Sequence, residues 1–583
     1  MKTYRGIIHV LPNEVILDAG GVEVKLQGDR AEFSPREGLV TAVTGVQMGD
    51  VIEHARVAPQ LESAKAISID AFSPVVSAIR EEGEAIAAHE GVVGIRPGFR
   101  LLENEAGEEP CMVILTRPGA TQDWPPASLR GVPVEVRTAS ALEMIEGTAP
   151  LEAWTGLVPE AAEAGSGIHY TPPDPDVVSL KEARVHNITC HVGPDSGWPI
   201  LKGFLEGTTS HLTVAMYEFY AKHILTAVCD LGEESDARLN IILQTGPGEN
   251  DKDTEELLRD SWGDRLEFTK ASVSGPNKVF KNSYHTKVVV RDSRAMWASS
   301  GNFSPNSQPK VTDSDAPNFY RLGNREWHVI IEDEELAKIY EKFIEHDIKQ
   351  AQEAAAMPAP EAMPEAMPDL LIPMEAFAAE AAVLQDHQFV ARTFATSGTP
   401  VKVQPLMSPD NYAAEILKLI QKAKKSLYLQ FSYIRQPSLE IFDDIISAIA
   451  EKMADPEIDV RVLVSQNQKS EHSDLLVGPR RWKRRMFRRQ TSKMHNKGVL
   501  IDGKIAVVGS NNWSSDGTQF NRDTSLVFHS REITKYYTEV FLFDWDNLSK
   551  PATGSEEIVP ELAGDGPTPL GKLRIPWQAW YDE

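Results

Sequence analysis

The chain has 583 residues, of which 42% are hydrophobic and 25% are charged, the composition of a folded globular protein. At about 100–200 residues per domain, this length predicts about three to five domains and excludes a single core. The formal net charge of −26 repels nucleic acid and anionic membranes in general, so a polyanion has to be bound through a local basic patch. The three cysteines, Cys111, Cys190 and Cys229, form no CxxC pair and exclude a disulfide framework.

The location of the protein is predicted from features of the whole chain. The N-terminal stretch MKTYRGIIHVLPNEV contains no hydrophobic signal core. No uncharged apolar run approaches the ~20 residues of a membrane helix, and unpaired cysteines indicate a reducing compartment. We therefore expect a cytoplasmic protein without a transmembrane segment.

Residues 1–65 are expected to form a small β-rich domain, because GIIHVL, EVILDA, VEVKL and LVTAVTG are separated by turn residues such as PNE and GG. Residues 66–150 are expected to form a small α/β accessory domain. A helix is predicted at SPVVSAIREEGEAIAAHE, and strands at VVGIRPGFRLL, PCMVILTR and VPVEVRT. No motif in these domains indicates chemistry, and the sequence identifies no partner for residues 1–180.

The rest of the chain contains one order of elements twice, in lobe 1 (residues 180–350) and in lobe 2 (residues 386–553). An apolar strand (HLTVAMYEFY; SLYLQFSYI) precedes a helix, a second strand, a polar loop, a His-x-Lys strand, an Asn-containing turn, a further strand and a closing helix. The ends of the copies align without gaps, NREWHVIIEDEELAKIYEKFIEHD against NRDTSLVFHSREITKYYTEVFLFD. This repeat predicts two similar α/β lobes, each a mixed sheet flanked by helices, packed as a pseudo-dimer.

Two biased segments flank the second copy. Residues 351–385, with their repeated EAMP, are typical of an Ala/Pro/Glu-rich linker that is semi-rigid or disordered. Residues 554–583 are expected to be a C-terminal tail that docks through Trp577 and Trp580.

Each lobe contains the same set of polar residues around its His-x-Lys strand. His and Lys two residues apart on a strand point to the same face, and Asp ends that strand before a turn. Ser and Asn follow the return strand, where the Asn amide lies beside the His and Lys. The lobe 1 set is His285, Lys287, Asp292, Ser300 and Asn302, and the lobe 2 set is His495, Lys497, Asp502, Ser510 and Asn512.

This arrangement resembles the phospholipase D superfamily, whose members carry His-x-Lys-(four residues)-Asp followed by Gly-Ser-x-Asn, and it is similar to bacterial-type phospholipase D-like proteins that carry the pattern twice. Lobe 1 departs from the pattern at Ser299, which stands in place of Gly. One His-x-Lys is a weak signal, whereas two full copies in an aligned repeat are specific. The resemblance covers both lobes, about 330 residues, and leaves the first 180 or so unexplained.

The resemblance implies phosphodiester chemistry at one centre formed by both lobes. Lys287, Lys497, Asn302 and Asn512 would neutralise and hydrogen-bond the non-bridging oxygens, and such preorganised stabilisation is usually the largest catalytic contribution. One imidazole would attack phosphorus to give a phosphohistidine. The other would protonate the leaving oxygen and then deprotonate the incoming water or alcohol. The family pattern favours His285 as nucleophile and His495 as acid and base, although the two copies are nearly symmetric.

The family pattern implies roles for the remaining motif residues. A carboxylate after the Asn turn, Glu326 in lobe 1 and Asp523 in lobe 2, would accept a hydrogen bond from a His ring and fix its tautomer. Asp292 and Asp502 are expected to be structural, and an ordinary turn position also explains them. Neither cofactor nor metal is expected, because Lys is a poor zinc ligand and no Cys or His lies at ligand spacing.

A basic stretch, GPRRWKRRMFRRQTSKMHNK (residues 478–497), contains no acidic residue and leads directly into His495. We expect it to capture an anionic substrate, with Trp482 stacking on a base or entering a lipid interface. A solvated or internally paired basic face is the alternative. The expected substrate-binding residues are Arg480, Arg481, Trp482, Lys483, Arg484 and Arg485.

Three classes of function fit these features. The leading hypothesis is a phospholipase D-type phosphodiesterase that hydrolyses or transfers a phospholipid phosphodiester through a phosphohistidine, in peripheral contact with a membrane. The alternative is a metal-independent nuclease that cleaves nucleic acid at the same site, because the motif contacts only the phosphate. A binding module with an inactive site is the third, and the complete residue sets in both lobes argue against it.

Overall fold

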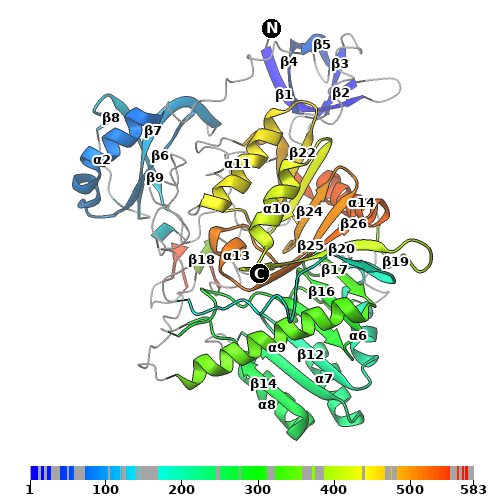
Figure 1. Cartoon of the computed structure of the whole chain (residues 1–583). Coiled ribbons are helices and arrows are strands. Elements are labelled where there is room, and N and C mark those ends of the chain that lie inside the picture. The colour runs from blue at the N-terminus through cyan, green and yellow to red at the C-terminus, as the bar shows by residue number, and fades with distance from the viewer. Residues whose placement is uncertain are drawn as a thin grey trace. The chain divides into compact units, whose positions relative to one another are not determined.

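The structure is a computed structural model of the whole chain. The described residues are 2–10, 15–18, 23–27, 40–48, 51–57, 72–102, 105–117, 120, 126–139, 143–144, 168–244, 250–274, 277–311, 322–357, 370–373, 387–435, 437, 440–465, 475, 482–551, 561–563, 568–569 and 572–575. The chain divides into two compact units, Met1–Ala71 and Phe72–Glu583 (Figure 1).

The first unit is a closed β barrel. Its strands follow the barrel order β1-β2-β3-β5-β4, so that every edge is paired. Val15 and Ile16 on one strand and Leu26 on the next are buried. The strands are β1 (Lys2–Val10), β2 (Val15–Asp18), β3 (Glu23–Gln27), β4 (Val40–Met48) and β5 (Val51–Val57).

The second unit begins with a small α/β module in which helix α2 (Ser73–Ala87) accompanies a sheet of order β6-β7-β9-β8. Its core includes the edge-to-face contact of Phe72 and Phe99, with ring centroids 5.0 Å apart, and buried Cys111. The strands are β6 (Val92–Leu102), β7 (Glu105–Thr116), β8 (Ser128–Leu129) and β9 (Val132–Thr138).

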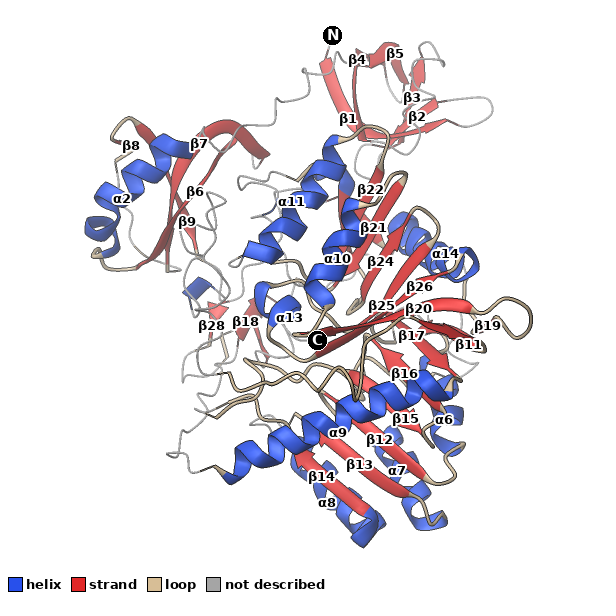
Figure 2. Cartoon of the chain, in the orientation of Figure 1, coloured by secondary structure: helices blue, strands red, loops and turns tan. Residues whose placement is uncertain are grey.

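Two mixed sheets flanked by helices form the rest of this unit (Figure 2), as the internal repeat predicts. Among the described strands, lobe 1 has the order β14-β13-β12-β15-β16-β17-β11-β19 and lobe 2 has β10-β20-β26-β25-β24-β21-β22-β23-β27. The lobe 1 elements are β11 (Ile188–Gly193), α6 (Gly197–Glu206), β12 (His211–Met216), α7 (Lys222–Glu234), β13 (Arg238–Leu243), α8 (Asn250–Trp262), β14 (Leu266–Lys270), β15 (Lys287–Arg291), β16 (Ala295–Ser299), β17 (Glu326–Ile331) and α9 (Glu334–Ala356). The lobe 2 elements are β20 (Val401–Ser408), α10 (Tyr412–Gln421), β21 (Ser426–Phe431), α11 (Glu440–Ala454), β22 (Asp459–Ser465), β23 (Phe487–Gln490), β24 (Lys497–Ile501), β25 (Ile505–Gly509), α13 (Ser515–Gln519), β26 (Asp523–His529), α14 (Arg531–Asn547) and β27 (Ser549–Pro551).

The lobes exchange edge strands, which the sequence analysis did not predict. Strand β10 (Ala183–Val185), at the start of lobe 1, pairs with β20 of lobe 2. Strand β19 (Arg392–Phe394), which precedes β20, pairs with β11 of lobe 1. Each sheet is therefore completed by a segment that belongs to the other copy, and this pairing covers an otherwise exposed edge.

The closing helices α9 and α14 begin at equivalent caps. The side chain of Asp333 accepts a hydrogen bond from the Leu336 amide at 2.8 Å, and Ser530 accepts one from the Ile533 amide, so both helices start with a satisfied amide. Figure 1 shows α9 crossing the strands of lobe 1.

The predicted linker differs from the structure at both of its described parts. Residues up to Ala356 continue helix α9. Strand β18 (Leu370–Pro373) pairs with β28 (Glu561–Leu562) and β29 (Lys572–Ile575) in a small sheet, so the linker and the tail meet in a defined structure. The remaining linker residues, and the expected anchors Trp577 and Trp580, lie outside the described residues.

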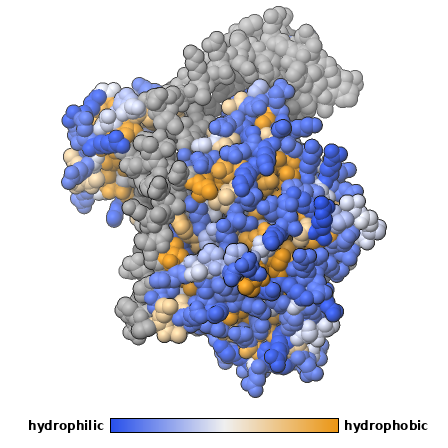
Figure 3. Space-filling view, in the orientation of Figure 1, coloured by the Kyte–Doolittle hydropathy of each residue, from blue (hydrophilic) through white to orange (hydrophobic). Residues whose placement is uncertain are grey.

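The surface in Figure 3 is mainly hydrophilic where the chain is described, with smaller hydrophobic areas between. The most exposed large hydrophobic side chains, such as Val177 and Val390, lie far apart in sequence. Within the described residues, no helix has the length and apolar character to cross a membrane.

Candidate active site

The two predicted His-x-Lys motifs meet at one centre between the lobes. His285 and Lys287 stand at the start of β15, and His495 and Lys497 stand at the start of β24. The two imidazole rings have centroids 6.1 Å apart. The histidines are 4% and 1% exposed, so burial shields this centre from bulk water.

Each histidine is oriented by a carboxylate of the opposite lobe. His285 Nδ1 lies 2.8 Å from Asp523 Oδ1, and His495 Nδ1 lies 3.0 Å from Glu326 Oε1. An ionised carboxylate only accepts hydrogen bonds, as does the Ser510 carbonyl that lies 3.1 Å from His285 Nδ1. Each Nδ1 therefore carries the proton, and each Nε2 has the lone pair. Neither lobe contains both partners of either pair.

The backbone repeats this exchange one residue earlier. The His285 amide donates to the Arg522 carbonyl at 2.7 Å, and the His495 amide donates to the Arg325 carbonyl at 3.2 Å. Two consecutive residues of the opposite lobe therefore fix both the main chain and the ring of each histidine.

Serine hydroxyls orient the two carboxylates in turn. Ser300 Oγ donates to Glu326 Oε2 at 2.5 Å, and Ser307 Oγ donates to Glu326 Oε1 at 2.9 Å. In lobe 2, Ser510 Oγ donates to Asp523 Oδ1 at 2.8 Å, while Asp523 Oδ2 has no hydrogen-bond partner among the described residues. The predicted Ser300 and Ser510 thus act through the carboxylates, and Ser307 was not predicted.

Glu326 and Asp523 differ in pKa because Glu326 accepts hydrogen bonds from two serines and Asp523 from one. Burial opposes ionisation of Glu326, but His495, Lys497 and Ser300 outweigh it and lower the pKa to about 2. Burial raises the pKa of Asp523 to about 7 against the effect of Lys287, because fewer donors stabilise its charge.

Burial and two nearby ammonium groups keep both imidazoles neutral. Burial, Lys287 and Lys497 lower the pKa of His285 well below its usual value. Burial and Lys497 lower the pKa of His495 to about 4, although Glu326 acts in the opposite direction. Neutral rings with Nδ1–H donated to carboxylates are the form in which Nε2 is available for chemistry.

The predicted Lys and Asn side chains lie at the same centre. Lys497 Nζ is 2.6 Å from His495 Nε2, whereas Lys287 Nζ donates to the His285 carbonyl at 2.6 Å. Asn512 Nδ2 lies 3.5 Å from His285 Nε2, and Asn302 Nδ2 donates to Glu218 Oε2 at 2.9 Å. These cationic and amide donors form a site suited to the non-bridging oxygens of a phosphodiester.

The motif aspartates lie away from the histidines and cap strands. Asp292 Oδ1 accepts hydrogen bonds from the backbone amides of Ser210 and His211 at 2.7 and 3.1 Å, before β12. Asp502 Oδ1 accepts bonds from the amides of Lys425 and Ser426 at 2.6 and 3.0 Å, before β21. These contacts assign both aspartates a structural role, in agreement with the expectation.

The basic stretch is only partly available for a substrate. Arg485 is exposed and Lys483 and Arg484 are partly exposed, while Arg480 and Arg481 lie outside the described residues. The interpretation of Trp482 as a stacking or membrane-inserting residue is wrong: it is 2% exposed in the lobe 2 core and donates its indole N–H to the Ile446 carbonyl at 3.3 Å. Burying the large apolar indole ring in the core is more favourable than leaving it at the surface.

Two buried ion pairs, which the sequence patterns did not predict, join the lobes beside the site. Arg325 Nε lies 2.9 Å from Asp544 Oδ2 on α14, and Arg522 Nη2 lies 2.6 Å from Asp347 Oδ1 on α9. Both arginines and both aspartates occupy equivalent positions in the aligned ends of the repeat. The same Arg and the same Asp at equivalent positions of both aligned ends were the available signal.

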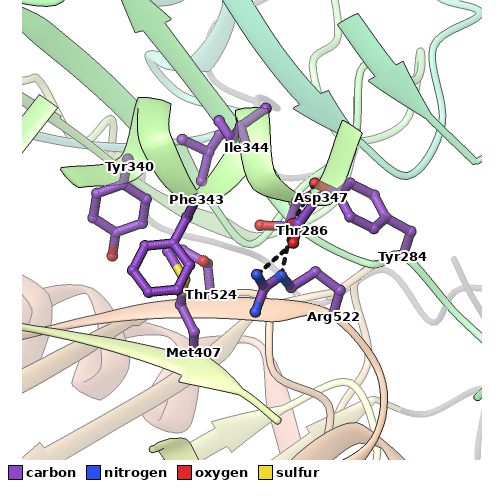
Figure 4. Close-up of a pocket in the computed structure, with 10 residues that line it drawn as sticks. Tyr284, Thr286, Tyr340, Phe343, Ile344, Asp347, Met407, Arg522 and Thr524 are labelled. Carbon is purple, nitrogen blue, oxygen red and sulfur yellow. Dashed lines mark hydrogen bonds and ion pairs between the residues drawn. The ribbon is translucent and has the colours of Figure 1, made fainter. Parts of the chain in front are cut away.

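A small pocket lies at the lobe interface beside one of these pairs. Its volume is about 10 Å³, space for about one water molecule, and Figure 4 shows the Arg522–Asp347 pair at its edge. The lining includes Val288, Tyr340 and Thr524.

At the equivalent position on the other side, Trp327 fills the space. Its ring lies 4.6 Å from that of Tyr537, and a Cβ on Gly498 would overlap it. The large residue of one lobe thus meets the glycine of the other.

Among the described residues, no group of three or more His, Cys, Asp or Glu side chains is arranged to hold a metal ion.

Comparison with known proteins gives the family. The family described as cardiolipin synthase, PLD-like domain, matches residues 201–348 and 416–545, one match in each lobe. A mitochondrial cardiolipin hydrolase of Xenopus tropicalis is 30% identical over 159 residues, which cover 27% of this chain and 70% of that protein. The protein of the same description from Mus musculus is 31% identical over 55 residues, 9% of this chain and 25% of that protein.

Two solved structures are also similar. Phosphatidylserine synthase of Haemophilus influenzae Rd KW20 has a TM-score of 0.44 at 12% identity, covering 64% of this chain and 90% of that one. Nuc, a phospholipase D family member from Salmonella typhimurium, has a TM-score of 0.23 at 15% identity, covering 29% of this chain and 96% of that one. Both TM-scores are low, so the family follows from the sequence matches. The chain belongs to the phospholipase D superfamily of phosphodiesterase-type enzymes.

Proposed function

We propose that this protein cleaves a phospholipid phosphodiester, by hydrolysis or by transfer to an alcohol, through a covalent phosphohistidine on His285. One observation carries the proposal. The rings of His285 and His495 lie 6.1 Å apart, and each Nδ1 bonds to a carboxylate of the opposite lobe. Neither Nε2 takes part in these pairs, so a phosphorus atom can be bound between the rings once Lys497 leaves His495 Nε2.

The choice of His285 as nucleophile is supported by an asymmetry between the lysines. Lys497 Nζ lies 2.6 Å from His495 Nε2 and occupies its lone pair. Lys287 Nζ instead bonds to the His285 carbonyl and lies over the Tyr217 ring, 5.0 Å from its centroid. The contact from Asn512 Nδ2 to His285 Nε2 is long, at 3.5 Å, so this lone pair is the more available of the two for attack on phosphorus.

The proposed reaction has two balanced steps. His285 Nε2 forms a bond to phosphorus as the ester oxygen leaves with a proton from His495. Water or an alcohol then gives a proton to His495 and attacks phosphorus, which breaks the P–N bond. An arriving phosphodiester adds negative charge and draws Lys497 toward its oxygens, and both effects favour the protonated form of His495 that the first step needs.

A phospholipid is proposed over nucleic acid because the matching family and relatives are described by cardiolipin. The exposed Arg485 and the partly exposed Lys483 fit a peripheral contact with anionic headgroups. The same charges fit a nucleic acid, so nuclease activity is an outcome that the test has to separate. The cytoplasmic location stays a prediction from the sequence.

The test is to trap the intermediate. His495→Asn leaves the nucleophile but removes the acid of the first step and the base of the second, so the phosphoryl adduct should form slowly and then accumulate because it is not hydrolysed. The variant is mixed with vesicles of phosphatidylglycerol and cardiolipin, quenched in alkali, digested and analysed by mass spectrometry. We expect the adduct on the peptide that contains His285, and the wild type should release head group in EDTA.

Controls make the outcome decisive. His285→Asn should show neither adduct nor turnover, with a loss of about 10⁴-fold or more in kcat, since the nucleophile of the covalent route is removed and His495 alone cannot form a phosphohistidine at that position. An adduct on His495 in the His285→Asn variant would show that His495 is the nucleophile and His285 the acid and base. Cleavage of single-stranded DNA in EDTA, without any cleavage of lipid, would contradict the phospholipase hypothesis and support the nuclease hypothesis.

A further inference from the structure

The two halves of the site differ at the strand ends that lead into it. Met216 on β12 pairs with Lys287, and Phe431 on β21 pairs with Lys497. The next residues are therefore equivalent in position, Tyr217 with Ser432 and Glu218 with Tyr433. Lobe 1 thus brings a carboxylate to the site at a position where lobe 2 has a phenol.

Because of Glu218, Asn302 is bonded through its amide nitrogen, whereas the equivalent Asn512 is bonded through its amide oxygen. Glu218 Oε2 lies 2.9 Å from Asn302 Nδ2, and Asn302 Oδ1 has no hydrogen-bond partner within the described parts of the chain. In lobe 2, Ser432 Oγ lies 3.1 Å from the oxygen of Asn512, and the nitrogen of Asn512 faces His285. One amide is therefore held by its nitrogen and the other by its oxygen.

Glu218 is also more accessible than the residues around it. It is partly exposed, whereas Lys287 and Asn302 are 0% and 1% exposed. Its charge raises the pKa of Lys287 against the stronger effects of burial and Lys497, which places the carboxylate within electrostatic reach of the anion site. A negative charge so close to a bound phosphodiester repels it, unless the substrate brings a donor that the carboxylate can accept.

We propose that Glu218 selects the alcohol of the substrate: it accepts a hydrogen bond or ion pair from a hydroxyl or ammonium group on the alcohol esterified to the phosphate. This inference rests on the proposed phosphodiester chemistry and names its substrate class. A glycerol hydroxyl and an ethanolamine ammonium share the required donor, a few bonds from phosphorus. A simple alkyl ester lacks it and offers Glu218 no such donor.

The experiment compares three soluble phosphodiesters that all release 4-nitrophenol, the 4-nitrophenyl esters of phosphoglycerol, phosphoethanolamine and propyl phosphate. The wild type should prefer the glycerol or the ethanolamine ester over the propyl ester by at least 10-fold in kcat/KM. Glu218→Gln should reduce that preference about 10-fold or more, as expected for the loss of a charged hydrogen bond. Tyr433→Phe, at the equivalent position of lobe 2, should change the preference by less than threefold.

The result that overturns the proposal is an equal loss on all three esters in Glu218→Gln, because Glu218 would then only position Asn302. Glu218→Asp, with the same charge on a shorter side chain, should keep part of the preference and guards against misfolding of the first variant. Wild type that cleaves the soluble esters with the expected preference but no vesicle lipid would refute the phospholipase and retain the role of Glu218. A wild type that cleaves none of the esters would refute both.

Discussion

His495 makes the free energy of unfolding depend on pH. Its pKa is about 4 in the folded chain because of burial and Lys497, and about 6.5 when unfolded. Between these values the unfolded chain binds a proton that the folded chain does not bind. The free energy of unfolding therefore decreases as the pH falls from about 6.5 to about 4. Glu326, with its pKa lowered to about 2, adds a loss only below about pH 4.5, so the two effects separate.

His495→Gln should remove the part of this dependence that His495 contributes, while the part from His285, whose pKa is also lowered, remains in both proteins. Between pH 7 and pH 4.5 the wild type should lose on the order of 2–3 kcal/mol more free energy of unfolding than the variant. Glutamine keeps a polar side chain but does not titrate in this range. Urea denaturation at the two pH values measures the difference. Equal losses in the two proteins would contradict a neutral, buried His495.

At the scale of single residues, the sequence predicts which side chains meet but not which lobe supplies each partner. His285, Lys287 and Asn302 are found from motif spacing alone. The pairing of His285 with Asp523 depends on how two sheets face each other, which spacing does not contain. Glu218 belongs to no motif, and only its register beside Lys287 makes it visible. Trp482 was misassigned because its basic neighbours suggested a surface that the packing of lobe 2 excludes.

Helices α9 and α14 each form an ion pair with the opposite lobe, at Arg522 and Arg325, the residues whose carbonyls accept from the histidine amides. Arg522, whose carbonyl accepts from the His285 amide, is 1% exposed and bonds to Asp347 on α9 through Nε and Nη2 at 2.7 and 2.6 Å. Arg325 is held on α14 in the same way. Breaking such a pair leaves an uncompensated buried charge, whereas replacing both Arg522 and Asp347 leaves only the partly exposed Asp410, 2.6 Å from Arg522 Nη1, without its cation. The order of elements followed from the repeat, but this cross-lobe attachment and the exchanged strands β10 and β19 needed the structure.

Replacing Arg522 and Asp347 singly and together tests this anchor. Arg522→Leu and Asp347→Leu should each destabilise the protein by about 3–5 kcal/mol, and the double variant should lose clearly less than the sum. Urea denaturation gives the three values. Each single variant should also lower kcat, because the Arg522 backbone positions His285. Additive losses would show that the pair does not couple the lobes.

Across the whole molecule, the interface is symmetric in its backbone and asymmetric in its side chains. Trp327 packs where Gly498 leaves room, and the equivalent Thr524 and Val288 enclose a small pocket instead. The sequence predicts that two lobes pack as a pseudo-dimer. It does not predict this large-against-small pairing, because Trp327 and Gly498 are 171 residues apart and belong to different copies.

Gly498→Ala should destabilise the protein by about 1–3 kcal/mol, the usual cost of overpacking a well-filled core. Because Gly498 follows Lys497, we also expect a fall in kcat. Trp327→Leu should make room for the new methyl group, so that the double variant loses less than the two single variants together. Thermal unfolding measures the three stabilities. Additive effects would mean that the alanine is accommodated elsewhere.

Joining the two copies in one polypeptide has a consequence for how the pocket can change. In a homodimer of identical lobes, every substitution appears on both sides of the two-fold axis, so a tryptophan packed on a glycine on one side would be repeated on the other. Tandem duplication lifts that restriction, and each half can then vary alone. Trp327 against Gly498 on one side with Thr524 and Val288 on the other, and an acidic group on one flank only, are differences that a protein made of two equal subunits is unable to acquire.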